Sequence, residues 1–151
     1  MRKTSKILLD TSFILLSFGV YLGKEVEQTL KKLMEMEEKT VTYYSTFNLL
    51  EAMLIIMREA RRGRIGRDQA VQMLNNGVLN VTLGLTKISE PYSIYAKALE
   101  LYLKGHRDII DNLLVALALE NKIKLLTLDR NLKRFLSDIG LEHLVITPNE
   151  L

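Results

Sequence analysis

Short apolar runs and longer segments with one apolar face alternate along this chain. The short runs lie at residues 6–10, 40–44, 124–128 and 144–147, and we expect a further short strand at 81–85. Apolar runs of this length that do not alternate with polar residues are typical of strands buried on both faces. The longer segments, at residues 25–38, 46–61, 67–76, 91–104 and 131–139, have the spacing of helices, and a sixth carries Asp108 and Asp111 and runs to a turn at 120–122.

Capping and helix-breaking residues set the expected boundaries of these segments. Asp10 and Ser12 are suitable N-caps for the apolar segment 13–20. Gly63 and Gly66 follow the helix that ends near residue 61, and Gly77 is expected to stop the helix of residues 67–76. Strands that alternate with helices favour a mostly parallel sheet covered by helices on both faces. A chain of 151 residues is expected to form one domain, 1–151.

The composition excludes several kinds of site. The absence of cysteine excludes disulfides, thiolate zinc sites and a cysteine nucleophile, and two histidines are too few for a histidine-rich metal site. No apolar run reaches the ~18 residues that span a bilayer, and Asp10 interrupts the apolar run after the basic residues 1–6. We therefore expect a cytoplasmic protein with no membrane partner. The net charge of +3 is compatible with a polyanionic partner and is also common in proteins that bind none.

Five carboxylates occur where the predicted fold brings residues to one edge of the sheet. Asp10 and Asp129 each follow a predicted strand, and open α/β sheets bind ligands at the carboxyl ends of their strands. Asp108 and Asp111 are three residues apart in the first turn of one helix and share a face. Glu51 is the one carboxylate in a segment, FNLLEAMLIIM, that is otherwise almost wholly apolar, and no lysine or arginine lies within one turn of it.

These carboxylates allow a structural and a catalytic interpretation. The aspartates can cap helices or complement their dipoles, and Glu51 can lie on a narrow exposed stripe with Asn48 and Arg58. If the five converge instead, their repulsion must be relieved by protonation or by a cation. Oxygen ligands suit Mg²⁺ or Mn²⁺, and two such ions would support the in-line displacement used by nucleases and phosphatases.

Four short blocks then occur in a particular order: ILLDTS at 7–12, STFNLLEA at 45–52, DNLLVALA at 111–118 and LLTLD at 125–129, the last followed by RNLKRF. As an ordered set they resemble the PIN-domain family, and most of all the VapC-type toxin ribonucleases of VapBC toxin–antitoxin pairs. The resemblance implies a three-layer α/β/α sandwich and an endoribonuclease that uses one or two Mg²⁺ or Mn²⁺ ions. It also implies an RNA substrate, an antitoxin partner and a homodimer.

The resemblance assigns catalysis and metal binding to an acidic quartet: Asp10, Glu51, Asp111 and Asp129. Asp10 and Asp111 would hold a metal ion, with the other two completing its shell directly or through water. Asp108 lies one helical turn before the third acid, and three roles stay open for it: a further metal ligand, a group that contacts the ligands, or a helix cap only. Small polar residues beside the acids would hydrogen-bond a carboxylate or a metal-bound water: Thr11, Ser12 and Thr127.

A dense arginine cluster follows the Glu51 helix and is a candidate for RNA binding: Arg58, Arg61, Arg62, Arg64 and Arg67. Arginine binds phosphate through paired hydrogen bonds, but a solvated helix end with favourable dipole contacts explains the cluster equally well. A stripe of tyrosine and leucine at helical spacing is typical of a core or a dimer surface: Tyr92, Tyr95, Leu99 and Tyr102.

Other functions stay open at this stage. A PIN-like chain can bind RNA or a protein without cutting it, although such a module has no need of mutually repelling carboxylates. A haloacid-dehalogenase-like phosphohydrolase needs an aspartate two residues after the first, where this chain has Ser12. Neither GxSxG nor a GK[ST] phosphate loop is present. His106 and Arg107 precede the acidic helix and are close enough in sequence to contact the scissile region, but solvation in a loop is the preferred explanation.

Overall fold

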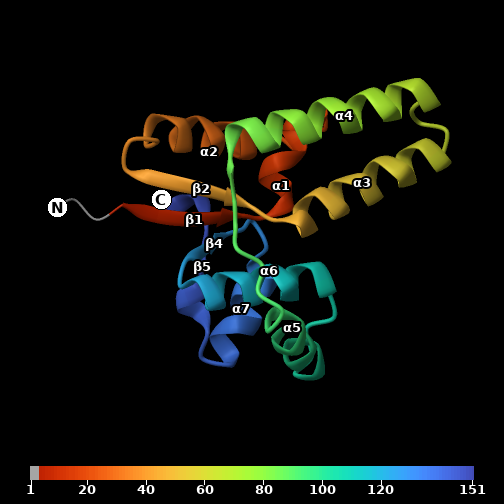
Figure 1. Cartoon of the computed structure of the whole chain (residues 1–151). Helices are drawn as coiled ribbons and strands as arrows, with labels where there is room; N and C mark the ends of the chain where they lie inside the picture. The colour runs from red at the N-terminus through yellow and green to blue at the C-terminus, as the bar shows by residue number, and fades with distance from the viewer. Residues whose placement is uncertain (1–3) are drawn as a thin grey trace.

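The computed structural model describes residues 4–151, and its centre is a five-stranded parallel sheet in the order β3-β2-β1-β4-β5 (Figure 1). The strands are β1 (Ser5–Leu9), β2 (Thr40–Tyr44), β3 (Thr86–Lys87), β4 (Lys124–Leu126) and β5 (Val145–Ile146). Every neighbouring pair is parallel, and Leu8 of β1 is in register with Tyr43 on one side and Leu125 on the other. The carboxyl ends of β1 and β4 therefore lie side by side.

Helices cover both faces of the sheet, as expected for a three-layer α/β/α sandwich (Figure 1). One layer contains α1 (Thr11–Ile14), the 3₁₀ helix η1 (Leu15–Phe18), α2 (Lys24–Glu35), α3 (Thr46–Arg61) and α4 (Arg67–Gly84). The other contains α5 (Ile94–Leu103), α6 (Ile109–Asn121) and α7 (Arg130–Asp138). Two further 3₁₀ turns flank β5: η2 (Glu142–Leu144) and η3 (Pro148–Glu150). No helix among residues 4–151 has the length and apolarity needed to cross a bilayer.

The central strand divides the core into two clusters. Ile7 and Leu9 point to one face, where they pack with Phe13, Phe18 and other residues of the layer that contains α1 to α4. Leu8 points to the opposite face and packs against the apolar residues of α5, α6 and α7. Because β1 is buried from Ile7 to Leu9 on both faces, its sequence shows no alternation. The expectation of strands buried on both faces is confirmed for β1.

Two predictions fail in the segment that contains α4. The helix does not stop at Gly77 but continues to Gly84, and the strand expected at 81–85 is part of this helix up to its last residue. Gly77 is buried, and a Cβ at this position would overlap the ring of Phe18. Gly77 therefore allows η1 and α4 to pack closely. The contacts with Phe18 compensate for the low helix propensity of glycine.

Most other boundaries follow the sequence. β2 covers residues 40–44 as predicted, and α3 covers 46–61 behind a capping box formed by Ser45 and Asn48. The apolar segment after β1 forms α1 and η1, which end at Gly19 in the left-handed conformation, with a φ of 81°. At the end of α6, Lys122 adopts a positive φ of 54° and produces the predicted turn before β4.

Replacement of Gly77 by alanine is expected to destabilise the protein by at least about 2 kcal/mol, within the usual range for overpacking a core. The added methyl group must displace the Phe18 ring or separate α4 from η1. Gly84→Ala is the matched control, because nothing lies within 4 Å of a Cβ at this position of the same helix. Denaturant unfolding measures both; equal stability of Gly77→Ala and the wild type would contradict the close packing.

Candidate active site

A cleft of about 340 Å³ opens at the carboxyl ends of β1 and β4 and contains all five carboxylates singled out from the sequence. It is lined by Asp10, Thr11, Ser12, Leu15, Glu51, Ile55, Asp108, Asp111, Leu128 and Asp129. These residues come from the end of β1, from α1 and η1, from α3, from the start of α6 and from the loop after β4. Among the described residues that line the cleft, none is a lysine, an arginine or a histidine.

Asp10 is the most deeply buried of these acids. It follows β1 directly, and its backbone N–H donates to the Leu126 carbonyl of β4 at 3.0 Å. Its carboxylate accepts from the Thr11 N–H at 2.6 Å and from the Thr127 hydroxyl at 2.8 Å. Burial raises the pKa of Asp10, although these two hydrogen bonds oppose the rise. Asp10 thus caps α1 and also faces the cleft, so both interpretations of this residue apply.

Asp108 and Asp129 are the N-caps of the two helices that begin at the cleft. Asp108 accepts from Ile110 N–H at 3.0 Å and Asp111 N–H at 3.1 Å. Asp129 accepts from the N–H groups of Asn131 and Leu132 at 2.8 and 3.0 Å. In both residues these bonds use one carboxylate oxygen, Oδ1, and leave Oδ2 available to a ligand. The capping interpretation is correct for both, and it does not remove them from the cleft.

Glu51 projects from α3 into the cleft and has one orphaned oxygen. Its Oε2 is buried and has no hydrogen-bond partner among the described residues. Burial raises the pKa of Glu51, and the charges of Asp10 and Asp108 add to the rise. The neighbouring Thr11 side chain and the charge of Arg58 oppose it. The interpretation that Glu51 and Asn48 share an exposed stripe is wrong, because Asn48 is fully buried. An unpaired buried carboxylate oxygen is costly and points to a ligand at this position.

Asp111 carries the largest perturbation. Its side chain is 14% exposed, and burial, together with the charges of Asp10, Asp108, Glu51 and Asp129, raises its pKa from 3.8 to about 8. Without a cation, Asp111 is therefore largely protonated at neutral pH. The mutual effects of the five carboxylates show that they share one electrostatic environment.

His106 lies beside Asp111 and is not the solvated loop residue that was expected. Its Nε2 is 4.0 Å from Asp111 Oδ2, and its ring packs against Phe135 with centroids 5.2 Å apart. Asn112 donates to the His106 carbonyl at 2.7 Å, so its Oδ1 accepts the proton of His106 Nδ1 at 2.9 Å. The neutral ring then presents a lone pair on Nε2 to Asp111. Arg107 is exposed, as expected.

The small polar residues differ in what they contact. Thr127 is fully buried and its hydroxyl, besides donating to Asp10, accepts from the Asp129 N–H at 3.0 Å. Thr11 accepts from Asn48 Nδ2 at 3.1 Å. Ser12 lines the cleft and is half-buried. Asn48 also belongs to this network and was not predicted from the sequence; its one visible signal is an amide in an apolar helix, one turn before Glu51.

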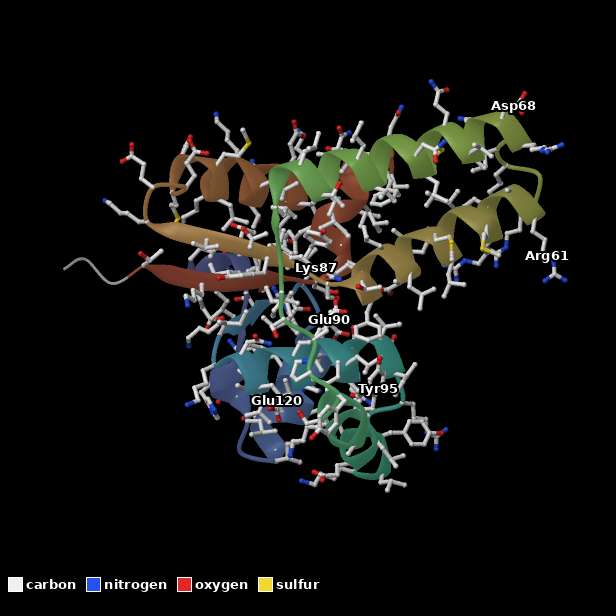
Figure 2. The ribbon with its side chains drawn as sticks, viewed as in Figure 1. Arg61, Asp68, Lys87, Glu90, Tyr95 and Glu120 are labelled. Atoms are coloured by element: carbon white, nitrogen blue, oxygen red, sulfur yellow. The ribbon has the colours of Figure 1, made fainter. Side chains whose placement is uncertain are left out.

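The five arginines lie outside the cleft. They occur on the second half of α3, in the turn that follows and at the start of α4, and Figure 2 shows Arg61 at the far end of α3 from the sheet. Glu59 pairs with Arg64 at 2.9 Å and with Arg62 at 3.7 Å. Arg58 lies on the same face of α3 as Glu51 and Ile55, by the spacing of an α-helix.

The chemistry of the cleft fits a hard divalent cation. All candidate donors are carboxylate or hydroxyl oxygens, which Mg²⁺ and Mn²⁺ prefer, and Glu51 Oε2 needs a partner. As the side chains stand, no three acidic or histidine side chains within residues 4–151 are positioned to hold one ion together. Mutual repulsion favours such separation, and a bound cation would offset it.

Comparison with known proteins identifies the family. The family model of the PIN domain matches residues 7–136, so this chain belongs to the PIN-domain family, whose members are generally nucleases. No curated protein sequence matches it.

Solved structures share the fold at low sequence identity. FitAcB from Neisseria gonorrhoeae has a TM-score of 0.60 at 18% identity, with 96% of this chain and 99% of that chain covered. VapBC2 from Rickettsia felis, bound to a promoter DNA fragment, has a TM-score of 0.63 at 14% identity, with 94% and 98% covered. VapC20 from Mycobacterium tuberculosis, a toxin that cleaves the sarcin–ricin loop, has a TM-score of 0.58 at 18% identity, with 85% and 93% covered.

In the absence of divalent cations, the stability of the protein is expected to fall as the pH rises from about 4 to about 8. Asp111 binds a proton more tightly in the folded protein than in the unfolded chain, so its stabilising effect is full below pH 3.8 and is lost as the pH rises through about 8. Asp111→Asn removes this loss and should be more stable than the wild type at pH 8.

Thermal unfolding in EDTA between pH 5 and pH 9 measures this dependence. Asp68→Asn, at an exposed aspartate in the first turn of α4 (Figure 2), is the control and should follow the wild-type profile. Parallel profiles for Asp111→Asn and the wild type would contradict the proposed electrostatic cost at Asp111.

Proposed function

We propose that this PIN-domain protein is a Mg²⁺- or Mn²⁺-dependent endoribonuclease and the toxin of a toxin–antitoxin pair. The observation that carries the proposal is the cleft itself, in which five carboxylates from four parts of the chain meet without a single basic residue among the described lining. Charges of one sign in a partly buried site destabilise the fold unless a ligand offsets them. A divalent cation is such a ligand, and metal-dependent nucleases use it to hydrolyse phosphodiester bonds.

Asp10, Glu51, Asp111 and Asp129 would hold the cation or cations, and Asp108 can add a free oxygen. When bound, the cation would offset negative charge that develops on the phosphorus oxygens during cleavage. The protein's own part is to fix the donors. Thr127 and the Thr11 N–H hold Asp10 in one orientation, and helix capping holds Asp108 and Asp129.

Contacts to the RNA backbone would come from the exposed arginines of α3 and α4. Arg58 lies seven residues after Glu51, about 10 Å along the same helix face. An RNA strand whose scissile phosphate lies in the cleft can therefore reach Arg58. Because Glu59 already pairs with Arg62 and Arg64, we assign the phosphate contacts mainly to Arg58, Arg61 and Arg67. Such contacts would give affinity without sequence preference.

An antitoxin protein is the expected partner. The structural similarity to FitAcB and to the DNA-bound VapBC2 supports this assignment, together with the placement of the chain in the PIN-domain family. A cytoplasmic location agrees with an RNA substrate and with the absence of cysteine.

A homodimer is also part of the proposal. α3 exposes Leu50, Leu54 and Met57 at positions i, i+4 and i+7, and α5 exposes Tyr95, Leu99 and Tyr102 at the same spacing. The rings of Phe47 and Tyr95 meet edge to face, with centroids 6.2 Å apart, and bring the beginnings of the two helices together. Exposed apolar residues grouped in this way are typical of an interface.

Asp10→Asn and Asp111→Asn are each expected to reduce Mn²⁺-dependent cleavage of a pooled structured RNA by about 100-fold or more. Both substitutions keep the side-chain shape and replace a carboxylate that can bind the cation with a neutral amide. Gel analysis of the RNA with Mn²⁺ or with EDTA measures cleavage, and circular dichroism shows whether each variant is folded. Asp68→Asn, outside the cleft, should cut as the wild type does.

Retained activity in both folded variants would eliminate the proposed site. A wild-type protein that binds the RNA in Mn²⁺ without cutting it would instead identify a binding module with the PIN fold.

Leu54→Asp is expected to convert the protein from a dimer to a monomer, because the substitution places a charge in the middle of the exposed face of α3. Leu83→Asp is the control: Leu83, on α4, is 78% exposed and outside that face. Light scattering after size exclusion gives the mass of each. A monomeric wild type, or a dimeric Leu54→Asp variant, would refute this interface.

A further inference from the structure

Asn48 is a fully buried amide in the first turn of α3, and its side-chain hydrogen bonds lead to the backbone and to Thr11 in the site. Its Oδ1 accepts from the Ser45 N–H at 2.8 Å. Its Nδ2 donates to the Leu9 carbonyl at 3.1 Å and to the Thr11 hydroxyl oxygen at 3.1 Å. A buried asparagine with both amide hydrogens used is a rigid group.

The orientation of this amide follows from its partners. A backbone N–H can only donate and a backbone carbonyl can only accept, so Oδ1 must face Ser45 and Nδ2 must face Leu9. With Nδ2 as the donor, Thr11 Oγ1 acts as the acceptor, and the hydroxyl proton of Thr11 is directed to another acceptor.

Asn48 therefore holds the chain on both sides of Asp10, at the carbonyl of Leu9 and at the side chain of Thr11. It also lies one helical turn before Glu51, on the same side of α3. The two carboxylates that come from different elements, Asp10 after β1 and Glu51 on α3, are thus connected through one amide. No other side-chain hydrogen bond among residues 4–151 joins α3 to the end of β1 or to α1.

We propose that Asn48 is a positioning residue, which sets the separation of Asp10 and Glu51 so that both can bind one divalent cation. This inference rests on the proposed function and extends it to a residue outside the acidic quartet. Asn48 does not line the cleft, so it would act through Asp10, Thr11 and Glu51 without touching the cation or the RNA.

The test compares Asn48→Ala with Ser45→Ala. Both remove hydrogen bonds of the same helix cap, because Ser45 Oγ accepts from the N–H groups of Phe47 and Asn48, but only Asn48→Ala breaks the link to Leu9 and Thr11. Calorimetry gives the Mn²⁺ affinity, thermal unfolding gives the stability, and cleavage at saturating Mn²⁺ gives the rate.

Asn48→Ala is expected to weaken Mn²⁺ binding by about 10- to 100-fold, as loss of a group that orients metal ligands commonly does. Ser45→Ala should lose stability but stay within about twofold of the wild-type affinity. If Asn48→Ala does not fold, Thr11→Val keeps the side-chain shape, breaks the contact of Thr11 with Asn48, and should weaken Mn²⁺ binding several-fold.

Wild-type Mn²⁺ affinity in a folded Asn48→Ala, or in Thr11→Val where Asn48→Ala does not fold, would overturn the positioning role. So would an equal loss of affinity in Ser45→Ala, since the effect would then belong to the helix cap. A wild type that binds Mn²⁺ but cuts no RNA would overturn the nuclease proposal, while the comparison of affinities would still decide the role of Asn48. A wild type that does not bind Mn²⁺ would overturn both.

Discussion

Electrostatic repulsion at the end of β1 opposes the packing that brings the carboxylates together. Asp10, Glu51 and Asp111 all have raised pKa values, with burial as the largest cause and the neighbouring carboxylates as a further one. The fold holds Asp10 in place with the Thr11 N–H and the Thr127 hydroxyl, which stabilise its charged form without neutralising it. The structure is therefore arranged to keep a negative charge that a bound cation can use.

The packing of the apolar core offsets the electrostatic cost of bringing these carboxylates together. Leu8 is buried between the sheet and one helical layer, and Ile7 and Leu9 are buried against the other, so the strand that ends in Asp10 is held from both faces. The close approach of Phe18 to Gly77 adds a contact between η1 and α4 in the layer above the cleft. A rigid strand end lets carboxylates stay near one another when local forces would separate them.

The sequence alone predicted the features that depend on the composition of a single helix or strand. The strands and the long helix α3 have buried residues or caps that local patterns reveal, and the carboxyl ends of parallel strands must share an edge, which brought Asp10 and Asp129 into one cleft. It failed where a contact between distant segments decides. Gly77 is typical of a helix end until Phe18 is known to lie against it, and His106 is typical of a loop until Phe135 covers its ring.

Asn48 shows the same limit inside the site. An asparagine in the first turn of a helix is explained by local capping alone, and its bonds to Leu9 and Thr11 become visible only when β1 and α3 are placed side by side. The charged residues can be found because burying them unpaired is costly. The neutral residues that orient them leave a weaker trace in the sequence, since an amide at such a position has several ordinary explanations.

The two opposite charges on this face of α3, Glu51 and Arg58, lie apart. A lysine or arginine inside the cleft would pair with the carboxylates, lower their pKa values and remove the advantage of a bound cation. Instead Glu51 lies near the sheet, and Arg58 lies on the same face about 10 Å further along, close to the screening length of about 8 Å at physiological salt. Arg58 lowers the pKa of Glu51, but as the least of the five influences on it. One helix can therefore present a carboxylate to a metal ion and a guanidinium to a phosphate, with each keeping its own charge.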